Sequence, residues 1–284
     1  MDINKYKFTG GKFDLKNYET GPAKHEAKNH VKEIFTNNKK EIAQLQCKLY
    51  AEGKQALLIL FQAMDGAGKD SSIKHVMSGI NPQGVNVHSF KQPSAEELAH
   101  GFLWRAVKAL PERGKIAIFN RSYYEDVLVV KVHNLHENLN IIERCKDSDV
   151  FTRRYGHIVN FENYLWDNAT NLIKIFLNVS PDEQRRRFLR RLARPDKNWK
   201  FSDADIKERG FWKKYQQAYV EAFINTASIH APWYIIPADK KWYTHAVISE
   251  ILAQTLKNMD PQYPEMPRKK VALMDEYRKQ LLSE

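Results

Sequence analysis

Residues 56–75 read ALLILFQAMDGAGKDSSIKH, and this stretch decides the fold. Its first six residues form a continuous apolar run of strand length, as expected for a parallel strand that is covered on both faces. The turn that follows contains Gly66 and Gly68, and it leads into a charged segment of helical spacing. A strand, a glycine-bearing turn and a helix in this order are typical of a loop whose backbone N–H groups bind phosphate.

The turn departs from the usual P-loop pattern, which is Gly, four residues, then Gly-Lys followed by Ser or Thr. Ala63 replaces the first glycine, Gly68 and Lys69 are retained, and Asp70 stands where a magnesium-binding hydroxyl is expected. The remaining glycines still allow N–H groups to face a phosphate, and Lys69 supplies a positive charge. We expect Asp65 to be the better magnesium ligand and Asp70 to cap the helix, since it lies at its start.

The remainder of the chain alternates apolar runs of strand length with amphipathic segments of helical spacing. This order predicts an α/β fold with a doubly wound, mainly parallel sheet flanked by helices. Ligands bind such sheets at the carboxyl ends of the strands. Further strands are expected at 84–90, 115–120, 172–179 and 232–238, and helices at 23–53, 70–78, 94–110, 182–194, 203–226 and 243–259.

The chain of 284 residues has a net charge of +11 and a pI near 9.4. Such a charge indicates a polyanionic partner, either nucleic acid, an acidic membrane surface or a phosphate-rich small molecule, unless the basic surface is unspecialised. The sequence contains no apolar run of about 18 residues, and its first residues contain no apolar signal core. Cys47 and Cys145 have no metal or redox spacing. We therefore expect a cytoplasmic protein with reduced thiols.

A second informative segment is 120–133, NRSYYEDVLVVKVH, which follows an apolar strand. A strand that leads into acidic residues resembles the Walker B arrangement, in which a carboxylate reaches magnesium. Asp126 is expected to be that carboxylate, and Arg121 at the strand end is placed to bind a phosphate through two parallel hydrogen bonds. Ser122 and Glu125 also have the spacing of a capping box, so we expect them to begin a helix.

Residues 182–212 are rich in arginine and lysine. On a helix, Arg187, Arg190, Arg191 and Arg194 share one face by three- and four-residue spacing. Such a stripe beside a phosphate site is typical of a nucleotide-kinase lid, whose arginines neutralise the transferring phosphoryl group and whose closure excludes water. A solvated charged face and a nucleic-acid-binding helix are the alternatives.

With these segments in order, the chain resembles the polyphosphate kinase 2 family over nearly its whole length. Asp70 is part of the resemblance, because aspartate after Gly-Lys is normal in this family. The resemblance implies a thymidylate-kinase-like P-loop kinase forming a single domain over 1–284, with an N-terminal helical extension at about 1–53 and a helical lid at about 182–212. The matching segments are MDGAGKDSSIKH (64–75), SFKQPSAEELAHGFLWR (89–105), FNRSYYEDVLVVKVH (119–133), FENYL (161–165) and RRFLRRLARPDKNWKFSDADIKER (186–209).

The resemblance also implies Mg²⁺-dependent phosphoryl transfer between inorganic polyphosphate and a nucleotide, with Mn²⁺ as a substitute ion. The implied catalytic residues are Asp65, Lys69, Arg121 and Asp126, of which Asp65 and Asp126 would hold the metal. The residues expected to bind phosphate or polyphosphate are Gly66, Gly68, Lys69, Asp70, Lys74, Lys131, Arg187, Arg190, Arg191 and Arg194, with His75 and His133 as further candidates. The residues expected to bind the nucleotide are Lys91, Glu125 and Arg121, with Phe90 or Pro93 near the base.

Glu125, where the diphosphate-preferring branch of the family typically has asparagine, resembles class III, which accepts both AMP and ADP; Asn120 agrees with this. The resemblance further suggests a homodimer or homotetramer, with no nucleic-acid or membrane partner. Two alternatives remain open, an ATP-dependent kinase of another small acceptor and a non-catalytic protein that binds polyphosphate or nucleic acid. The retained carboxylates argue against the second, because they would repel a polyanion unless a metal lies between them.

Overall fold

The computed structural model describes residues 1–23 and 26–284. In this described part of the chain a six-stranded sheet has the order β1-β6-β5-β2-β4-β3. Strands β2 to β6 are parallel to one another, and β1 alone pairs antiparallel, with β6. The doubly wound, mainly parallel sheet is therefore confirmed. The strands are β1 (Lys7–Phe8), β2 (Ala56–Ala63), β3 (Val85–Ser89), β4 (Ile116–Asn120), β5 (Thr170–Asn178) and β6 (Trp233–Pro237).

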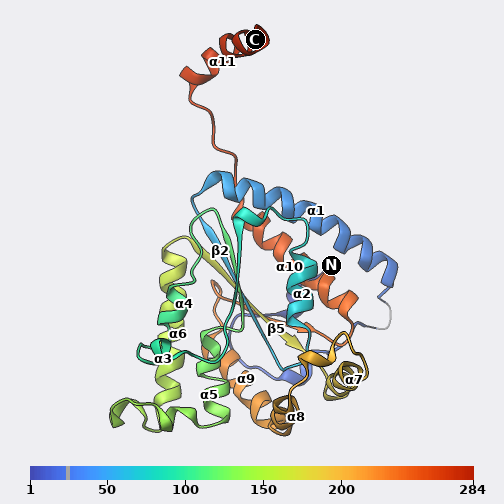
Figure 1. The fold of residues 1–284 in the computed structure, drawn as a ribbon, viewed down its shortest axis with the longest axis vertical. Helices are drawn as coiled ribbons and strands as arrows, with labels where there is room; N and C mark the ends of the chain where they lie inside the picture. The colour runs from blue at the N-terminus through green and yellow to red at the C-terminus, as the bar shows by residue number, and fades with distance from the viewer. Residues whose placement is uncertain (24–25) are drawn as a thin grey trace.

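Helices cover both faces of the sheet (Figure 1). Helices α1, α2 and α10 pack together on one face, and α5, α6 and α9 pack together on the other. The α-helices are α1 (Lys28–Glu52), α2 (Lys69–Val76), α3 (Ala95–Leu98), α4 (Trp104–Val107), α5 (Val129–Val132), α6 (Val150–Asp167), α7 (Pro181–Leu192), α8 (Asp203–Gly210), α9 (Trp212–Thr226), α10 (Lys241–Met259) and α11 (Arg268–Leu282).

Strand β2 lies at the centre of the sheet, between β4 and β5. All eight of its residues are buried, which is why this strand is apolar over nearly its whole length. Helix α1 ends at Gly53, which adopts the left-handed conformation at φ 63°, and the chain then turns into β2. The carboxyl end of β2 delivers the glycine-bearing turn to the edge of the sheet where the ends of β4 and β5 also lie.

Two helix predictions require correction. The segment 94–110 is two short helices, because the chain leaves helical geometry between Leu98 and Trp104, around Gly101. Ser94 and Glu97 nevertheless form a complete capping box at its start. The segment 203–226 is likewise two helices, α8 and α9, that meet at Phe211. Helix α6 was not predicted.

The predicted helical extension at 1–53 is helical only from Lys28 onward, apart from two short 3-10 turns. Residues 24 and 25 of the helix expected at 23–53 lie outside the described residues. The first residues instead add the short β1 to the sheet edge and bury Tyr6 and Phe8. Tyr6 Oη lies 2.7 Å from Tyr243 Oη of α10, so the segment packs onto the domain. At the other end, none of the side chains described in α11 is buried, and the helix projects outward (Figure 1).

Among the described residues, no helix has both the length and the apolar character that crossing a bilayer requires.

Candidate active site

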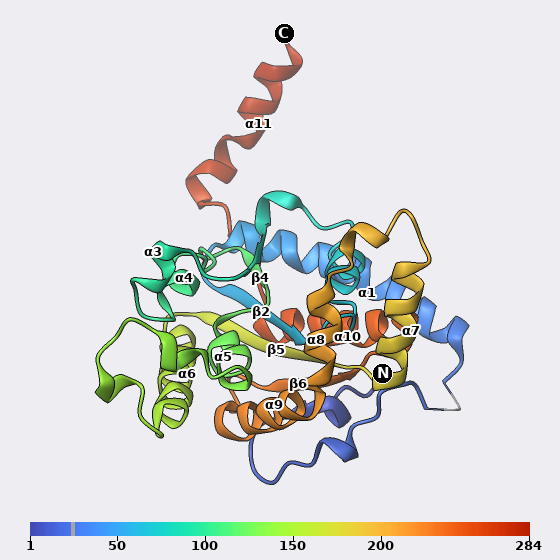
Figure 2. The ribbon, with the colours of Figure 1, turned by 60° about the horizontal axis from the view of Figure 1, so that its bottom comes forward.

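The turn after β2 has the geometry of a phosphate-binding loop. Gly66 and Gly68 adopt φ values of 77° and 104°, which favour glycine. A Cβ on Gly66 would lie 3.0 Å from the Phe188 ring, and a Cβ on Gly68 would lie 3.5 Å from Arg187 Nη1. Helix α7 therefore packs directly over the turn. Its Phe188 ring leaves little room for a side chain at Gly66, whereas Gly68 is favoured by its positive φ alone. Figure 2 shows α7 and α8 beside the ends of β2 and β5.

Lys69 begins α2 and donates a hydrogen bond from Nζ to the carbonyl oxygen of Ala63, at 3.1 Å. Burial lowers the pKa of Lys69, and the positive charge of Arg121 lowers it further, while the charges of nearby carboxylates oppose the shift. Its ammonium group therefore lies in a site of low hydration beside the loop. There it would gain strongly from a bound phosphate.

Asp70 does not cap α2, so that expectation is wrong. Gly68 is the N-cap residue, without a side-chain cap, and Asp70 already belongs to the first turn of the helix. The Asp70 carboxylate instead accepts a hydrogen bond from Asn120 Nδ2 at 2.9 Å. Because Asn120 ends β4, this bond ties the start of the P-loop helix to the neighbouring strand.

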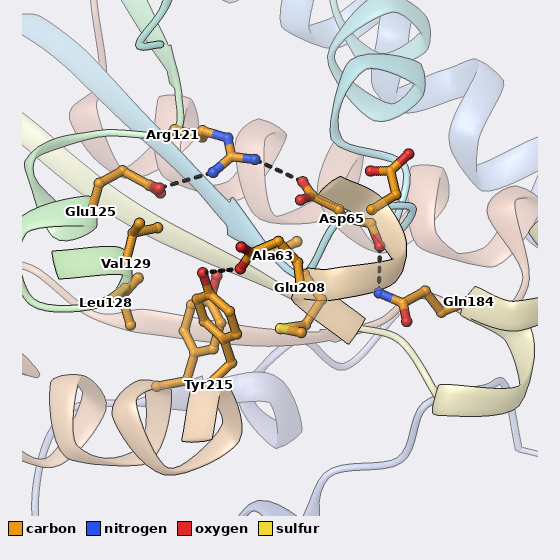
Figure 3. Close-up of a pocket in the computed structure, with 12 residues that line it drawn as sticks. Ala63, Asp65, Arg121, Glu125, Leu128, Val129, Gln184, Glu208 and Tyr215 are labelled. Atoms are coloured by element: carbon orange, nitrogen blue, oxygen red, sulfur yellow. Dashed lines mark hydrogen bonds and ion pairs between the residues drawn. The ribbon is translucent and has the colours of Figure 1, made fainter. Parts of the chain in front are cut away.

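Arg121 joins two carboxylates. It follows β4 with a left-handed φ of 65°, an unusual conformation for a residue with a side chain. Its guanidinium donates to Asp65 Oδ1 at 2.7 Å and to Glu125 Oε2 at 2.9 Å, as Figure 3 shows. The negative charge of Glu125, followed by that of Asp65, raises the pKa of Arg121. Arg121 is 36% exposed, so it borders the pocket.

These residues line a small pocket, the P-loop pocket, which α7 and α8 border on one side (Figure 3). Gln184 of α7 donates from Nε2 to the Asp65 carbonyl oxygen at 2.7 Å. Glu208 of α8 accepts a hydrogen bond from Tyr215 Oη at 2.7 Å and lies 3.0 Å from His133 Nε2. The residues that line the P-loop pocket are Ala63, Met64, Asp65, Arg121, Glu125, Leu128, Val129, Gln184, Asp205, Glu208, Tyr215 and Tyr219.

The predicted arginine stripe of the lid is corrected for Arg187. This side chain is only 8% exposed, and it donates to the carbonyl oxygens of Gly66 and Ala238 and to Glu183. Arg187 thus holds the P-loop backbone in place rather than facing solvent. Spacing along a helix shows which residues share a face, but it does not show which of them another element covers.

The other lid arginines are more accessible. Arg191 pairs with Asp205 at 3.0 Å, which joins α7 to α8. Arg194 pairs with Asp196 at 2.8 Å and is about half exposed. Arg190 is exposed on α7. These contacts leave the three side chains on the outer part of the lid.

The charge of Lys131 is already paired within the fold, and its role in binding polyphosphate stays a prediction. Its ammonium forms an ion pair with Glu221 of α9 and lies 5.2 Å from the centre of the Phe151 ring. It therefore joins α5 to its neighbours. His75 stacks on His245 at 4.6 Å between ring centres, whereas Lys74 is exposed on α2.

A second pocket, of about 480 Å³, lies beside α3, α4 and α6. Two arginines that line it are largely buried, Arg105 at 8% exposure and Arg154 at 7%. Arg105 donates to the carbonyl oxygen of Lys91 at 2.9 Å, and Arg154 donates to that of Asp126 at 2.6 Å. The residues that line the second pocket are Pro93, Glu97, Leu98, His100, Gly101, Phe102, Leu103, Trp104, Arg105, Asp126, Leu139, Ile141, Cys145, Val150, Arg153, Arg154 and His157.

Asp126 lines this second pocket and not the P-loop pocket. Ser122 and Glu125 do not form the expected capping box, because Ser122 Oγ accepts from the Tyr124 amide and Glu125 pairs with Arg121. Residues 123–126 form one 3-10 turn, so Glu125 and Asp126 face different pockets. Burial raises the pKa of Asp126 to about 6, against the opposing charge of Arg154.

The structure therefore separates the residues expected to bind the nucleotide. Glu125 and Arg121 line the P-loop pocket, while Lys91 is exposed and contributes its carbonyl group to Arg105. Phe90 packs against Phe119 at 4.8 Å between ring centres, so it is part of the core edge. Pro93 lines the second pocket.

Sequence reasoning missed Arg105 and Arg154. Arg105 lies within a segment that matches the family, but it belongs to no phosphate-binding motif. In α6, Arg154 occupies a face with Val150, Ile158 and Leu165, all of them buried. A charged residue on the apolar stripe of a helix is the signal that was available for it.

Asp65 and Glu125 are the carboxylates that Arg121 brings together. Carboxylate oxygens suit Mg²⁺, which commonly takes one or two of them and completes its shell with water and substrate phosphate oxygens. No group of three His, Cys, Asp or Glu side chains within the described ranges is arranged to hold a metal by itself. The donor set at the P-loop pocket therefore fits a metal that the substrate helps to bind.

The family model described as Polyphosphate kinase 2 (PPK2) matches residues 25–264. An "ADP-polyphosphate phosphotransferase" of Rhodopseudomonas palustris is 44% identical, with 99% of this chain and 100% of that protein covered. An "AMP/ADP-polyphosphate phosphotransferase" of Meiothermus ruber is 42% identical, with 93% and 96% covered.

Among solved structures, polyphosphate kinase 2 from Arthrobacter aurescens matches with a TM-score of 0.86 and 36% identity, and 95% of each chain is covered. Sequence, site geometry and fold thus agree, and the chain belongs to the polyphosphate kinase 2 family.

Proposed function

We propose that this chain transfers the terminal phosphoryl group of inorganic polyphosphate to AMP and ADP, reversibly. The observation that carries the proposal is the 121–126 turn, which borders two pockets. Arg121 and Glu125 face the P-loop pocket, and Asp126 faces the second pocket. A donor in one pocket and an acceptor in the other would meet at this turn. The names of the relatives at 42% and 44% identity support the same pair of substrates.

The donor end of polyphosphate would occupy the P-loop pocket. Lys69, whose Nζ bonds the carbonyl oxygen of the lining residue Ala63, and the loop amides would supply positive charge beside it. The exposed arginines Arg190 and Arg194 would continue this charge outward. The net charge of +11 agrees with a long polyanion as substrate. Because exposed cations release counterions on binding a polyanion, affinity for polyphosphate should fall steeply with salt.

The nucleotide would occupy the second pocket. Its phosphate would approach the buried guanidinium groups of Arg105 and Arg154, whose contacts within the fold are mainly to carbonyl oxygens. Its base would lie against the apolar wall that Phe102 and Trp104 contribute. Lys91 lies exposed at the same end of the sheet, where it can reach the acceptor.

Mg²⁺ is the metal we propose, with Mn²⁺ as a substitute. Asp65 would hold it in the P-loop pocket, and Asp126 would contribute from the second pocket when both substrates are bound. Glu125 is a further carboxylate at this point, because Arg121 binds it together with Asp65. When bound, the ion would neutralise charge on the phosphate oxygens.

The chemistry requires positioning more than it requires a base. An oxygen of the acceptor phosphate attacks the end phosphorus of polyphosphate in line with the leaving chain. That oxygen is already anionic near neutral pH, so no side chain has to remove a proton. Lys69 and Arg121 stabilise the charge on the equatorial oxygens, and closure of the lid excludes water as a competing acceptor.

The test is to mix the protein with polyphosphate, Mg²⁺ and AMP, and to follow ADP and ATP over time. We expect ADP first and then ATP. ADP without ATP would restrict the acceptor to AMP, and no product from either AMP or ADP would contradict the proposal. Replacing polyphosphate by ATP separates it from an ATP-dependent kinase of the same fold.

We also propose self-association, as a homodimer or homotetramer. Helix α11 exposes Val271, Met274, Tyr277 and Leu281 at three- and four-residue spacing, an apolar face that none of the described residues buries. Sedimentation of the protein and of a Met274→Glu variant tests this. A wild-type monomer at micromolar concentration would contradict it.

A further inference from the structure

Lys174 of β5 and Glu162 of α6 form an ion pair inside the protein. Lys174 Nζ lies 2.5 Å from Glu162 Oε2, and the two side chains are 0% and 2% exposed. Neither residue lines the P-loop pocket or the second pocket. Glu162 belongs to the segment 161–165, one of the segments that match the polyphosphate kinase 2 family. This segment has no role in the proposed chemistry.

Stability is a weak reason for such a pair. Removing two charges from water is costly, and apolar residues of similar volume are often equally stable or more so in the same place. Burial dominates here, since it raises the pKa of Glu162 and lowers that of Lys174 against their mutual attraction. The contacts of the pair indicate a role other than stabilising the fold.

The pair is bonded to the two residues at the middle of the 121–126 turn. Glu162 Oε1 accepts hydrogen bonds from Tyr123 Oη and from Tyr124 Oη, both at 2.9 Å. Lys174 Nζ donates to Tyr124 Oη at 3.1 Å and to the Thr226 carbonyl oxygen at 2.8 Å. Both tyrosines are fully buried. One carboxylate oxygen thus fixes two consecutive side chains of the turn.

The tyrosine rings are also held laterally. Tyr123 meets Phe161 edge-on at 5.5 Å, and Tyr124 meets Trp233 edge-on at 4.8 Å. Hydrogen bonds to the hydroxyl groups and contacts along the sides of the rings together hold each tyrosine side chain in one orientation. The backbone between them is correspondingly fixed.

The residues that flank the tyrosines carry the proposed chemistry. Arg121 precedes them in a left-handed conformation, φ 65°, which costs energy and persists only where the surroundings impose it. Glu125 and Asp126 follow them and face the two pockets. An anchor beneath Tyr123 and Tyr124 is therefore placed to hold all three charged groups in register.

We propose that the Lys174–Glu162 pair is a positioning device that sets Arg121, Glu125 and Asp126 for phosphoryl transfer. The proposal rests on the function proposed above, which places those three residues at the reacting groups. A displacement of about 1 Å in such a constellation can lower the rate by about a hundredfold. The pair would thus affect turnover more than substrate binding.

The decisive variants change both partners together, so that no unpaired charge stays buried. Glu162→Leu with Lys174→Met replaces the pair by apolar side chains of similar volume. We expect kcat to fall by about 10- to 100-fold, with KM for polyphosphate changed by less than about threefold. Glu162→Gln with Lys174→Met keeps an acceptor oxygen for the tyrosines, and we expect it to recover most of kcat.

Leu256→Ala is the matched control for lost stability. Leu256 is fully buried in α10, on the opposite face of the sheet, so its truncation should lower Tm while leaving kcat at 25 °C unchanged. The inference is overturned if the Leu/Met variant keeps kcat within about threefold of wild type. It is also overturned if the Gln/Met variant recovers nothing, because the tyrosine contacts would then be irrelevant.

Three further variants keep the outcome decisive. If the Leu/Met variant does not fold, Tyr123→Phe with Tyr124→Phe removes only the two hydroxyl groups and must show the same loss of kcat. Glu125→Gln tests the proposed function separately. Full activity of Glu125→Gln and of Arg121→Lys would contradict the proposed site, whereas their inactivity beside a fully active Leu/Met variant would contradict the positioning role alone.

Discussion

The P-loop pocket and the second pocket border the same turn, but they hold their charges in opposite ways. In the P-loop pocket the Arg121 guanidinium is bonded to two carboxylates, Asp65 and Glu125. In the second pocket Arg105 and Arg154 donate to carbonyl oxygens, and each lies 3.9 Å from a carboxylate, Glu97 and Asp126 respectively. Positive charge is thus already paired in one pocket and available in the other.

This difference indicates which substrate each pocket suits. A pocket whose carboxylates are already paired with a guanidinium group can bind a metal cation together with a phosphate chain. The positive charge of the metal and the negative charge of the phosphates then balance each other. Two buried guanidinium groups whose nearest carboxylate contacts are as long as 3.9 Å suit a single anionic group instead. Helices α7 and α8 also close the first pocket, whereas α3, α4 and α6 surround the second.

The largest effect is expected from Lys69→Met. The ammonium group of Lys69 lies beside the P-loop, where charge develops during transfer, so its loss should lower kcat by about 10²- to 10³-fold. Steady-state kinetics with polyphosphate and AMP provide the measurement. A loss below tenfold would mean that the P-loop pocket does not receive the transferring group.

The next effect tests the second pocket. Arg154→Met should raise KM for AMP by about 10- to 100-fold, because a charge-assisted hydrogen bond to the nucleotide phosphate is lost. KM for polyphosphate should change by less than about threefold. Arg278→Met on the exposed α11 removes the same charge elsewhere and should change neither value. An equal rise in both KM values would contradict separate sites.

A smaller effect concerns stability and pH. Asp126 has a pKa of about 6 in the folded protein because of burial, above its ordinary value of 3.8. Its charge therefore destabilises the folded state at pH values above 6. Asp126→Asn should raise the free energy of unfolding by about 1 to 3 kcal/mol at pH 8. The gain should fade as pH falls from 6 to 4, where the carboxyl becomes protonated in the folded protein.

Urea unfolding of the wild type and of Asp126→Asn, at pH 8 and at pH 4.5, measures the difference in their free energies of unfolding. The same variant should lose phosphoryl transfer at pH 8 while it still binds polyphosphate. Destabilisation of Asp126→Asn at pH 8 would show that the carboxylate has a stabilising partner there, and the contrast between the two pockets would be lost.

The smallest effect is expected from Arg194→Ala. Arg194 is half exposed and pairs with Asp196, so it contributes long-range attraction rather than a fixed contact. The affinity for polyphosphate should fall by about twofold at low salt and by less at high salt. Titration at two ionic strengths measures it. A loss of tenfold or more would give this arginine a direct role in the site.

Much of the fold could be predicted because long apolar runs and glycine turns depend on local physics. The strand at 56–63 is apolar because it is buried on both faces. Strand β1 was missed because two residues carry no periodicity, and its pairing with β6 is a tertiary event. Helix α6 was missed because charged residues such as Arg154 and Glu162 lie on its buried face.

The parts of the site that a sequence motif defines could be predicted, and the parts that depend on tertiary packing could not. Asp65, Lys69 and Arg121 meet as expected, since strand order brings two turns to one edge of the sheet. Glu125 and Asp126 are neighbours in sequence, and only the 3-10 turn decides which pocket each one faces. Arg187 became a support for the loop because α7 packs on it, which helical spacing does not reveal.

The central claim is that donor and acceptor bind in separate pockets, and equilibrium binding of AMP to the Lys69→Met variant tests it most directly. This variant slows transfer by about 10²- to 10³-fold, so binding can be measured by calorimetry before much AMP is converted, with and without saturating polyphosphate in the presence of Mg²⁺. We predict an AMP affinity within about threefold of its value without polyphosphate. Displacement of AMP by polyphosphate would contradict the two-pocket arrangement.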